Sequence, residues 1–174
     1  MLSTFSKQRG SNSNANKYSE INNVQLQYGK MLAAAAGVKR GHKVLDMGCG
    51  TGELTSFLAQ KVGEESQVVG VDPDSERIKV AIQKHSQNII FKHGESSSQF
   101  PHFDEQYYDI HFSNFVFQWL TPEEKEIFVQ TAFKCLKAGG KIAIQSHEDD
   151  ADIVKEAKNI SVPKGYAVRR VSAV

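Results

Sequence analysis

Three glycines alternate with other residues in the segment VLDMGCGTGEL, Val44–Leu54, directly after a short apolar run. Asp46 lies inside that run, and Gly48, Gly50 and Gly52 follow it. Glycine permits positive φ angles and lets a ligand approach the backbone closely. A helix that begins after such a loop also offers free N–H groups. The segment therefore indicates either a tight turn or a loop that binds a nucleotide-type cofactor.

Spacing and charge favour one kind of cofactor. The glycines follow G-x-G-x-G, whereas dinucleotide-binding folds use G-x-G-x-x-G. Asp46 would repel a pyrophosphate but attract an ammonium group. Asp72 ends a second apolar segment, QVVGVD, about 20 residues after the loop, where a carboxylate can accept both ribose hydroxyls. S-adenosylmethionine has a ribose, a cationic amine and no pyrophosphate, whereas the alternative, an NAD-type oxidoreductase, fits neither the spacing nor Asp46.

Elements of a parallel sheet can bring these residues to one edge. Hydrophobic periodicity and turn residues predict helices at 22–41, 52–63, 74–85 and 121–140, and strands at 42–48, 67–72, 88–94, 107–117 and 141–147. Asn22 is the expected cap of the first helix, and Gly37 its stop. Strands joined by helices form parallel sheets with right-handed crossovers. The predicted fold is α/β, a doubly wound Rossmann-like sheet that binds ligands at the carboxyl ends of its strands.

The composition is that of an ordinary globular domain. The chain has 174 residues, a hydrophobic share of 40% and a net charge of +1, which gives no indication of a nucleic-acid or membrane partner. Cys49 and Cys135 are too few for a disulfide framework and lack metal-site spacing, so no metal is expected and the cytoplasm is the expected compartment. The Ser/Asn-rich residues 1–17 are predicted to form a disordered arm, with mitochondrial targeting as the alternative.

Three motifs carry a family resemblance. VLDMGCGTG, VVGVDPDS and KHGESS resemble, in this order, the successive cofactor motifs of class I S-adenosylmethionine-dependent methyltransferases. The resemblance runs from about Tyr18 to His147. It implies a methyltransferase domain at 18–174 with its cofactor-binding core at 40–147.

The resemblance also assigns cofactor contacts. It implies that Asp46 and the loop from Gly48 to Gly52 face the methionine part, and that Asp72 binds the ribose hydroxyls. Cys49, in that loop, is interpreted as a small structural residue. The other implied contacts are Pro73 beside the adenine, Glu95 and Ser96 near the adenine edge, and Asn114 at the end of the fourth strand. The family prefers Asp at position 95 and Ser at position 74, so Asp74 is interpreted as a helix cap.

A narrower resemblance concerns the substrate. FSNFVFQWL, Phe112–Leu120, is similar to the end of strand four in trans-aconitate and juvenile hormone acid methyltransferases, and YSEINNVQ is similar to a pattern upstream of the first strand in the juvenile hormone enzymes. This implies that Gln25 and Trp119 hold a substrate carboxylate. An exposed helical position is the alternative for Gln25. Phe112, Phe115 and Phe117 are expected to pack in the core.

The expected reaction is methyl transfer to a small molecule, with a carboxylic acid as the expected acceptor. A carboxylate is already ionised at pH 7, so positioning suffices and no general base is needed. If the acceptor were a phenol or an amine, a base would help, and His147 after the fifth strand is the candidate. His111 lies in mid-strand and is expected to pack.

The segment after His147 is shorter than its counterpart in the family. Two further strands follow there in the family, whereas residues 148–174 have room for one helix and one strand. We therefore expect the C-terminal strands to be missing or truncated. The missing strands are the reason for an alternative function, a cofactor-binding but inactive interaction module. The sequence leaves the methyl acceptor and the oligomeric state open.

Overall fold

The computed structural model describes residues 9–85, 88–97, 100–146 and 167–169. This part of the chain contains five helical segments and six strands. They are α1 (Arg9–Ala36), β1 (Val44–Met47), α2 (Glu53–Val62), β2 (Val68–Asp72), α3 (Ser75–Lys84), β3 (Ile89–His93), β4 (Tyr108–Asn114), the 3-10 turn η1 (Phe117–Trp119), α4 (Pro122–Cys135), β5 (Leu136–Gln145) and β6 (Ala167–Arg169).

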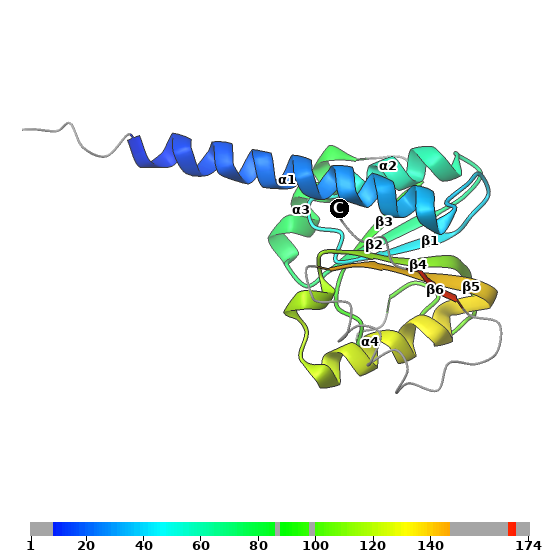
Figure 1. Ribbon diagram of the computed structural model, residues 1–174. Coiled ribbons are helices and arrows are strands. Elements are labelled where there is room, and N and C mark those ends of the chain that lie inside the picture. The colour runs from blue at the N-terminus through cyan, green and yellow to red at the C-terminus, as the bar shows by residue number, and fades with distance from the viewer. Residues whose placement is uncertain (1–8, 86–87, 98–99, 147–166, 170–174) are drawn as a thin grey trace, which may run out of the picture.

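The strands form one parallel sheet in the order β3-β2-β1-β4-β5-β6. The order reverses direction at β1, so β1 and β4 meet at the topological switch point where such folds bind ligands. This confirms the predicted doubly wound Rossmann-like fold. Helices α1 and α2 cover one face of the sheet, and α4 covers the other (Figure 1).

Alternation along the strands divides the core between these two faces. Val44 packs with Leu32 of α1 and Leu58 of α2 in one buried cluster. Its neighbour Leu45 points the other way and packs in a cluster with Phe128 of α4. All residues of β1 and β2 are buried, which explains why these strands read as short continuous apolar runs.

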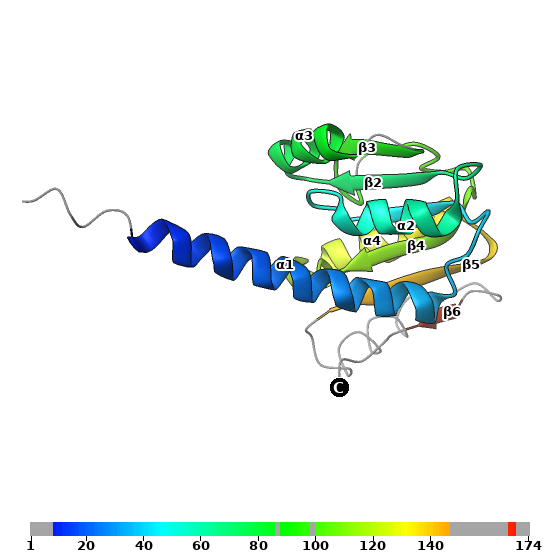
Figure 2. The same cartoon turned by 90° about the horizontal axis from the view of Figure 1, so that it is seen from above.

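Helix α1 is longer than the sequence predicts. It begins at Arg9 and not at Asn22, so residues 9–17 of the expected disordered arm are helical. Ser and Asn lower helix propensity only slightly, and no proline interrupts the segment, so the helix continues through them. Its end agrees with the prediction, because Gly37 follows the last helical residue at φ 75°. The N-terminal part of α1 projects beyond the sheet (Figure 2).

The boundary between α4 and β5 also differs from the prediction. The helix was expected over residues 121–140, yet β5 already begins at Leu136, which pairs with Tyr108 across an irregularity in the register. Long-range pairing decides this boundary, and it is not visible in local sequence. The expected strand near the C-terminus is present as β6, parallel to β5, and the expected helix after residue 148 lies outside the described residues. In the part of the chain that the structure describes, no helix is long and apolar enough to cross a membrane.

Candidate cofactor-binding site

The glycine loop between β1 and α2 is held by the end of β2. The N–H groups of Gly48 and Cys49 donate to the Val71 carbonyl oxygen at 2.7 and 3.0 Å. The next N–H donor, Gly50, bonds the Asp72 carboxylate at 2.8 Å. The loop is therefore fixed by two strands at the carboxyl edge, as the cofactor interpretation requires, and not only by a local turn.

The three glycines meet different surroundings. Each has a positive φ angle, of 82° at Gly48, 56° at Gly50 and 87° at Gly52. A Cβ on Gly48 would lie 2.0 Å from a methyl carbon of Val116, and one on Gly52 would lie 2.8 Å from the Phe91 ring. A Cβ on Gly50 would meet no atom within 4 Å. Gly48 and Gly52 thus allow close packing, whereas the backbone at Gly50 faces open space that a ligand can occupy.

Asp46 is buried beneath this loop. Only 1% of its surface is exposed, and the Thr55 hydroxyl donates to its carboxylate at 2.7 Å. Burial raises the pKa of Asp46 to about 7, the Thr55 hydrogen bond opposes the rise, and the charge of Asp72 adds to it. Thr55 was not predicted as a site residue from the sequence. It lies in the first turn of α2, directly behind the loop, and this position is the signal that could have indicated it.

Asp72 connects the glycine loop with the following turn. One carboxylate oxygen accepts the Gly50 N–H, and the other accepts the Asp74 N–H at 2.9 Å. The side chain is 4% exposed. Each oxygen keeps a further lone pair, so the carboxylate can still accept hydroxyl donors. Asp74 caps α3 by accepting from the N–H groups of Glu76 and Arg77, which confirms its interpretation as a helix cap.

The residues expected near the adenine lie at the ends of β2 and β3. Pro73 is exposed, and its carbonyl oxygen contacts the His93 ring nitrogen at 3.0 Å. Glu95 is exposed and accepts the Ser97 hydroxyl at 2.6 Å. Ser96 is buried, and its carbonyl oxygen accepts the Thr131 hydroxyl of α4.

Asn114 ends β4 and connects the sheet to α1. Its side-chain amide donates to the Gln25 carbonyl oxygen at 2.9 Å. The Oδ1 atom of Asn114 is buried and has no partner among the described residues. An unpartnered buried oxygen costs free energy unless a donor reaches it, so this atom marks a position where a ligand donor would be stabilising.

The two expected substrate residues differ in their surroundings. Gln25 is half-buried beside the end of β4, whereas 79% of the Trp119 surface is exposed. The described residues therefore do not enclose the Trp119 indole. Phe112, Phe115 and Phe117 are buried, as expected for core residues.

Two histidines were considered in the sequence analysis, His111 and His147, and neither provides a general base in the described part of the site. His111 is fully buried, packs edge-on against the Phe128 ring, and has a pKa lowered to about 3 by burial. It packs in the core, as expected. His147 lies outside the described residues.

The remaining features fit a site for a cationic organic cofactor. The thiol of Cys49 is buried, and burial raises its pKa, which agrees with a structural role. No group of His, Cys, Asp or Glu within the described ranges could hold a metal ion.

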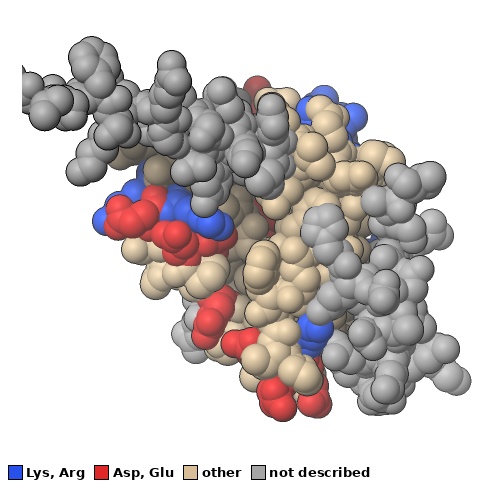
Figure 3. Space-filling model, turned by 60° about the vertical axis from the view of Figure 1, so that its left-hand side comes forward, with Lys and Arg blue, Asp and Glu red and all other residues tan. Residues whose placement is uncertain are grey.

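Charged side chains of both signs lie on the side of the molecule from which α1 projects, which Figure 3 turns toward the viewer. Neither Asp46 nor Asp72 has a lysine or arginine partner in the described chain, so no basic side chain competes there with a cationic ligand.

The chain matches the methyltransferase domain family over residues 44–140 and belongs to that family. S-adenosylmethionine is the cofactor of this family, and the loop, the two carboxylates and the open space at Gly50 fit it. The matched region begins with β1 and ends in β5, so it contains every element of the site except α1.

Individual relatives agree with this assignment. The ubiquinone/menaquinone biosynthesis C-methyltransferase UbiE of Pseudoalteromonas translucida is 28% identical over 138 residues, which are 75% of this chain and 54% of that protein. An arsenic(III) S-adenosylmethionine methyltransferase from Chlamydomonas reinhardtii is 28% identical, with a TM-score of 0.54, over 59% of this chain and 38% of the other. The chain thus spans about half the length of the curated relative.

One solved structure resembles nearly the whole chain. It is a TehB-like methyltransferase from Corynebacterium glutamicum, with a TM-score of 0.63 and 22% identity over 88% of this chain and 83% of the other. This likeness supports the fold. None of these relatives supports the narrower resemblance to trans-aconitate or juvenile hormone acid methyltransferases.

The packing of Gly48 generates a first prediction. Gly48→Ala and Gly50→Ala both place a side chain at positive φ, which costs about 1–2 kcal/mol. Only Gly48→Ala also overlaps Val116, which adds about 1–3 kcal/mol. Urea unfolding should therefore show the larger loss for Gly48→Ala, and Val116→Ala should recover part of it in the double variant. Equal losses in the two single variants would contradict this packing.

The buried carboxyl of Asp46 generates a second prediction. Its folded pKa of about 7 exceeds the reference value of 3.8, so the folded protein retains a proton that the unfolded chain releases. The free energy of unfolding should then fall as pH rises between these two values, by about 4 kcal/mol at most. Asp46→Asn should remove this slope in urea unfolding at several pH values. Asp104→Asn, at an exposed position, should retain it, and a slope in Asp46→Asn equal to that of the wild type would refute the assignment.

Proposed function

We propose that this protein transfers a methyl group from S-adenosylmethionine to a small molecule. The observation that carries the proposal is the pair of buried carboxylates, Asp46 and Asp72, on either side of a glycine loop that is open at Gly50. Bound S-adenosylmethionine supplies an electrophilic methyl group on a positively charged sulfur. The contribution of the protein is to bind and orient the two reactants.

Each candidate residue has a role in this proposal. Asp72 accepts the ribose hydroxyls with its remaining lone pairs, and Asp46 attracts the ammonium group of the methionine part. The unpartnered Asn114 Oδ1 accepts a donor from the ligand. Pro73, Glu95 and Ser96 line the adenine side, and Gly48, Cys49 and Gly52 shape the loop.

A carboxylic acid is the acceptor that we propose. Gln25 lies beside Asn114, where an acceptor could approach the cofactor edge, and the Gln25 amide and the Trp119 indole N–H are donors suited to a carboxylate. An ionised carboxylate needs no base, and His111 cannot act as one because it is buried with a lowered pKa. Alignment of the carboxylate behind the methyl group would then provide the catalysis.

A specific observation favours a second acceptor class. The relative from Pseudoalteromonas translucida is named as a C-methyltransferase of quinone biosynthesis. A ring carbon beside a phenol is therefore the alternative acceptor, and its reaction would need a base.

An inactive cofactor-binding module, formed by a domain of residues 18–174, is the alternative function to methyl transfer. For the compartment, the free and buried Cys49 and Cys135 support a reducing environment such as the cytoplasm.

The role of Asp72 can be tested by calorimetric titration with S-adenosylhomocysteine. Asp72→Asn weakens two hydrogen bonds to a charged acceptor, each worth about 1.5–3 kcal/mol, so affinity should fall at least about tenfold. Asp74→Asn is the matched control, since asparagine also caps helices and its affinity should stay near that of the wild type. Binding by Asp72→Asn as tight as that of the wild type would rule out the ribose role.

The acceptor can be tested by a methyl-transfer assay with aliphatic carboxylic acids and with phenolic rings. Carboxylic acids should be methylated, and Gln25→Ala and Trp119→Phe should each lower kcat/KM about tenfold without changing cofactor affinity. Gln27→Ala, an exposed glutamine of the same helix, should leave kcat/KM unchanged. Turnover of phenols alone would overturn the carboxylate proposal but retain the methyltransferase, and cofactor binding without turnover of either class would favour the inactive module.

A further inference from the structure

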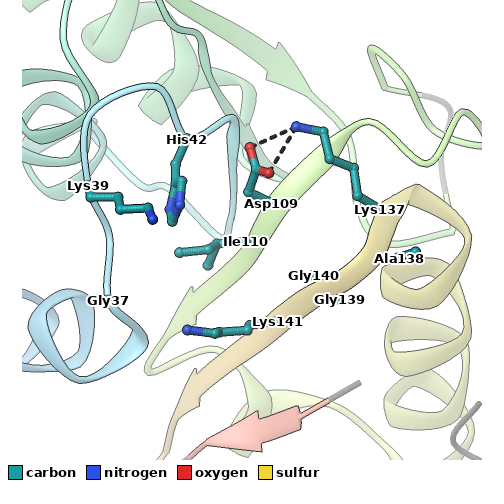
Figure 4. Close-up of a pocket in the computed structure, with 10 residues that line it drawn as sticks. All are labelled: Gly37, Lys39, His42, Asp109, Ile110, Lys137, Ala138, Gly139, Gly140 and Lys141. Atoms are coloured by element: carbon teal, nitrogen blue, oxygen red, sulfur yellow. Dashed lines mark hydrogen bonds and ion pairs between the residues drawn. The ribbon is translucent and has the colours of Figure 1, made fainter. Parts of the chain in front are cut away.

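A pocket of about 280 Å³ lies at the amino edge of the sheet, opposite the cofactor site. Its walls come from the connection between α1 and β1, the start of β4 and the start of β5. Figure 4 shows the side chains of Lys39, His42 and Lys141 around this space, with Asp109 and Lys137 joined on the far side. None of these residues belongs to the cofactor site.

Positive charge dominates the pocket. Lys39, Lys137 and Lys141 contribute three ammonium groups, and Asp109 is the only acid among the lining residues, so two positive charges remain uncompensated. Burial lowers the pKa of His42, the charges of the three lysines add to the lowering, and Asp109 opposes it. The lowered pKa disfavours a positive charge on the His42 ring.

Asp109 already pairs with one of the three lysines and therefore offsets a single positive charge. Lys137 donates to both carboxylate oxygens at 2.9 Å, and the Lys43 N–H donates to one at 2.8 Å. Lys141 donates instead to the Ala36 carbonyl oxygen at 3.0 Å, at the C-terminal end of α1, where the helix dipole offsets only part of its charge. The Lys39 side chain has no hydrogen-bond or ion-pair partner among the described residues.

Holding like charges around a concave space costs electrostatic free energy unless an anion binds there. Lysine ammonium groups bind phosphate as point charges, and Gly139 and Gly140 leave the pocket wall without side chains. The volume lies just below the range of about 300–1,000 Å³ that is usual for drug-sized ligands, which suits a small anion better than a nucleotide. We propose that this pocket binds a phosphate group, either free or carried by a small monoester.

The His42 ring provides a reporter for this site. Sodium phosphate is titrated into the labelled full chain at constant ionic strength, and the ring resonances are followed by NMR, with His42→Gln assigning them. We expect a saturable shift and a rise in the pKa of His42, because a bound anion offsets the repulsion from the lysines. Methyl phosphate in place of inorganic phosphate distinguishes the two sources, and saturable binding of either supports the site.

Lysine variants locate the binding. Lys39→Met should weaken phosphate binding about tenfold without affecting folding, since its side chain is exposed. Lys141→Met should weaken it similarly, and Lys92→Met, an exposed lysine of β3, should have no effect. S-adenosylhomocysteine affinity should stay unchanged in Lys39→Met, which separates this site from the proposed function. Shifts that do not saturate, that chloride reproduces, or that persist unchanged in Lys39→Met would overturn the proposal.

Discussion

The hydrogen bond from the Gly50 N–H to the Asp72 carboxylate is the contact on which the cofactor edge depends. It fixes the loop after β1 to the end of β2, while the other oxygen of Asp72 fixes the turn into α3. One side chain therefore connects the glycine loop with the turn into α3, beside two strands that their backbone pairing already aligns. Gly70 in β2 contributes to the same packing, because a Cβ there would lie within 3.0 Å of Phe91 and Cys49.

This arrangement has an electrostatic cost. Asp46 is buried close enough to Asp72 for the two charges to oppose each other, and one hydroxyl, that of Thr55, compensates Asp46 directly. A structural core would not retain two nearby acids in this way, since uncompensated buried charge is destabilising. Electrostatic repulsion between buried acids is typical of a binding site, where the ligand supplies the missing positive partner.

Features with a local signature could be predicted from the sequence. The apolar runs of β1 and β2, the glycine loop and the cap at Asp74 each depend on residues within a few positions of one another, and the structure has them where expected. The proposed site roles of Asp46 and Asp72 rest on the same local motifs. Membership of the methyltransferase family then extended the prediction of the fold to the rest of the matched region.

Features that depend on contacts between distant segments could not be predicted. Leu136 begins a strand because it pairs with Tyr108, and Gly48 is required partly because Val116 lies against it. The pairing of Thr55 with Asp46 needs the crossing of α2 over β1 to be known. Trp119 was expected to hold a substrate carboxylate, and its side chain is exposed among the described residues. This exposure depends on which residues surround η1 in space, and the four neighbouring aromatic residues of the sequence do not contain that information.

The two ends of the sheet carry opposite charge, which has a consequence for how ligands arrive. The carboxyl edge holds the acidic groups of Asp46 and Asp72, and the amino edge holds the lysines Lys39, Lys137 and Lys141. These groups give the two ends of the strands local potentials of opposite sign in a chain whose net charge is only +1. The carboxyl edge would attract cations and the amino edge anions. At physiological salt this attraction acts over about 8 Å, so it selects ligands by charge in the last step of approach.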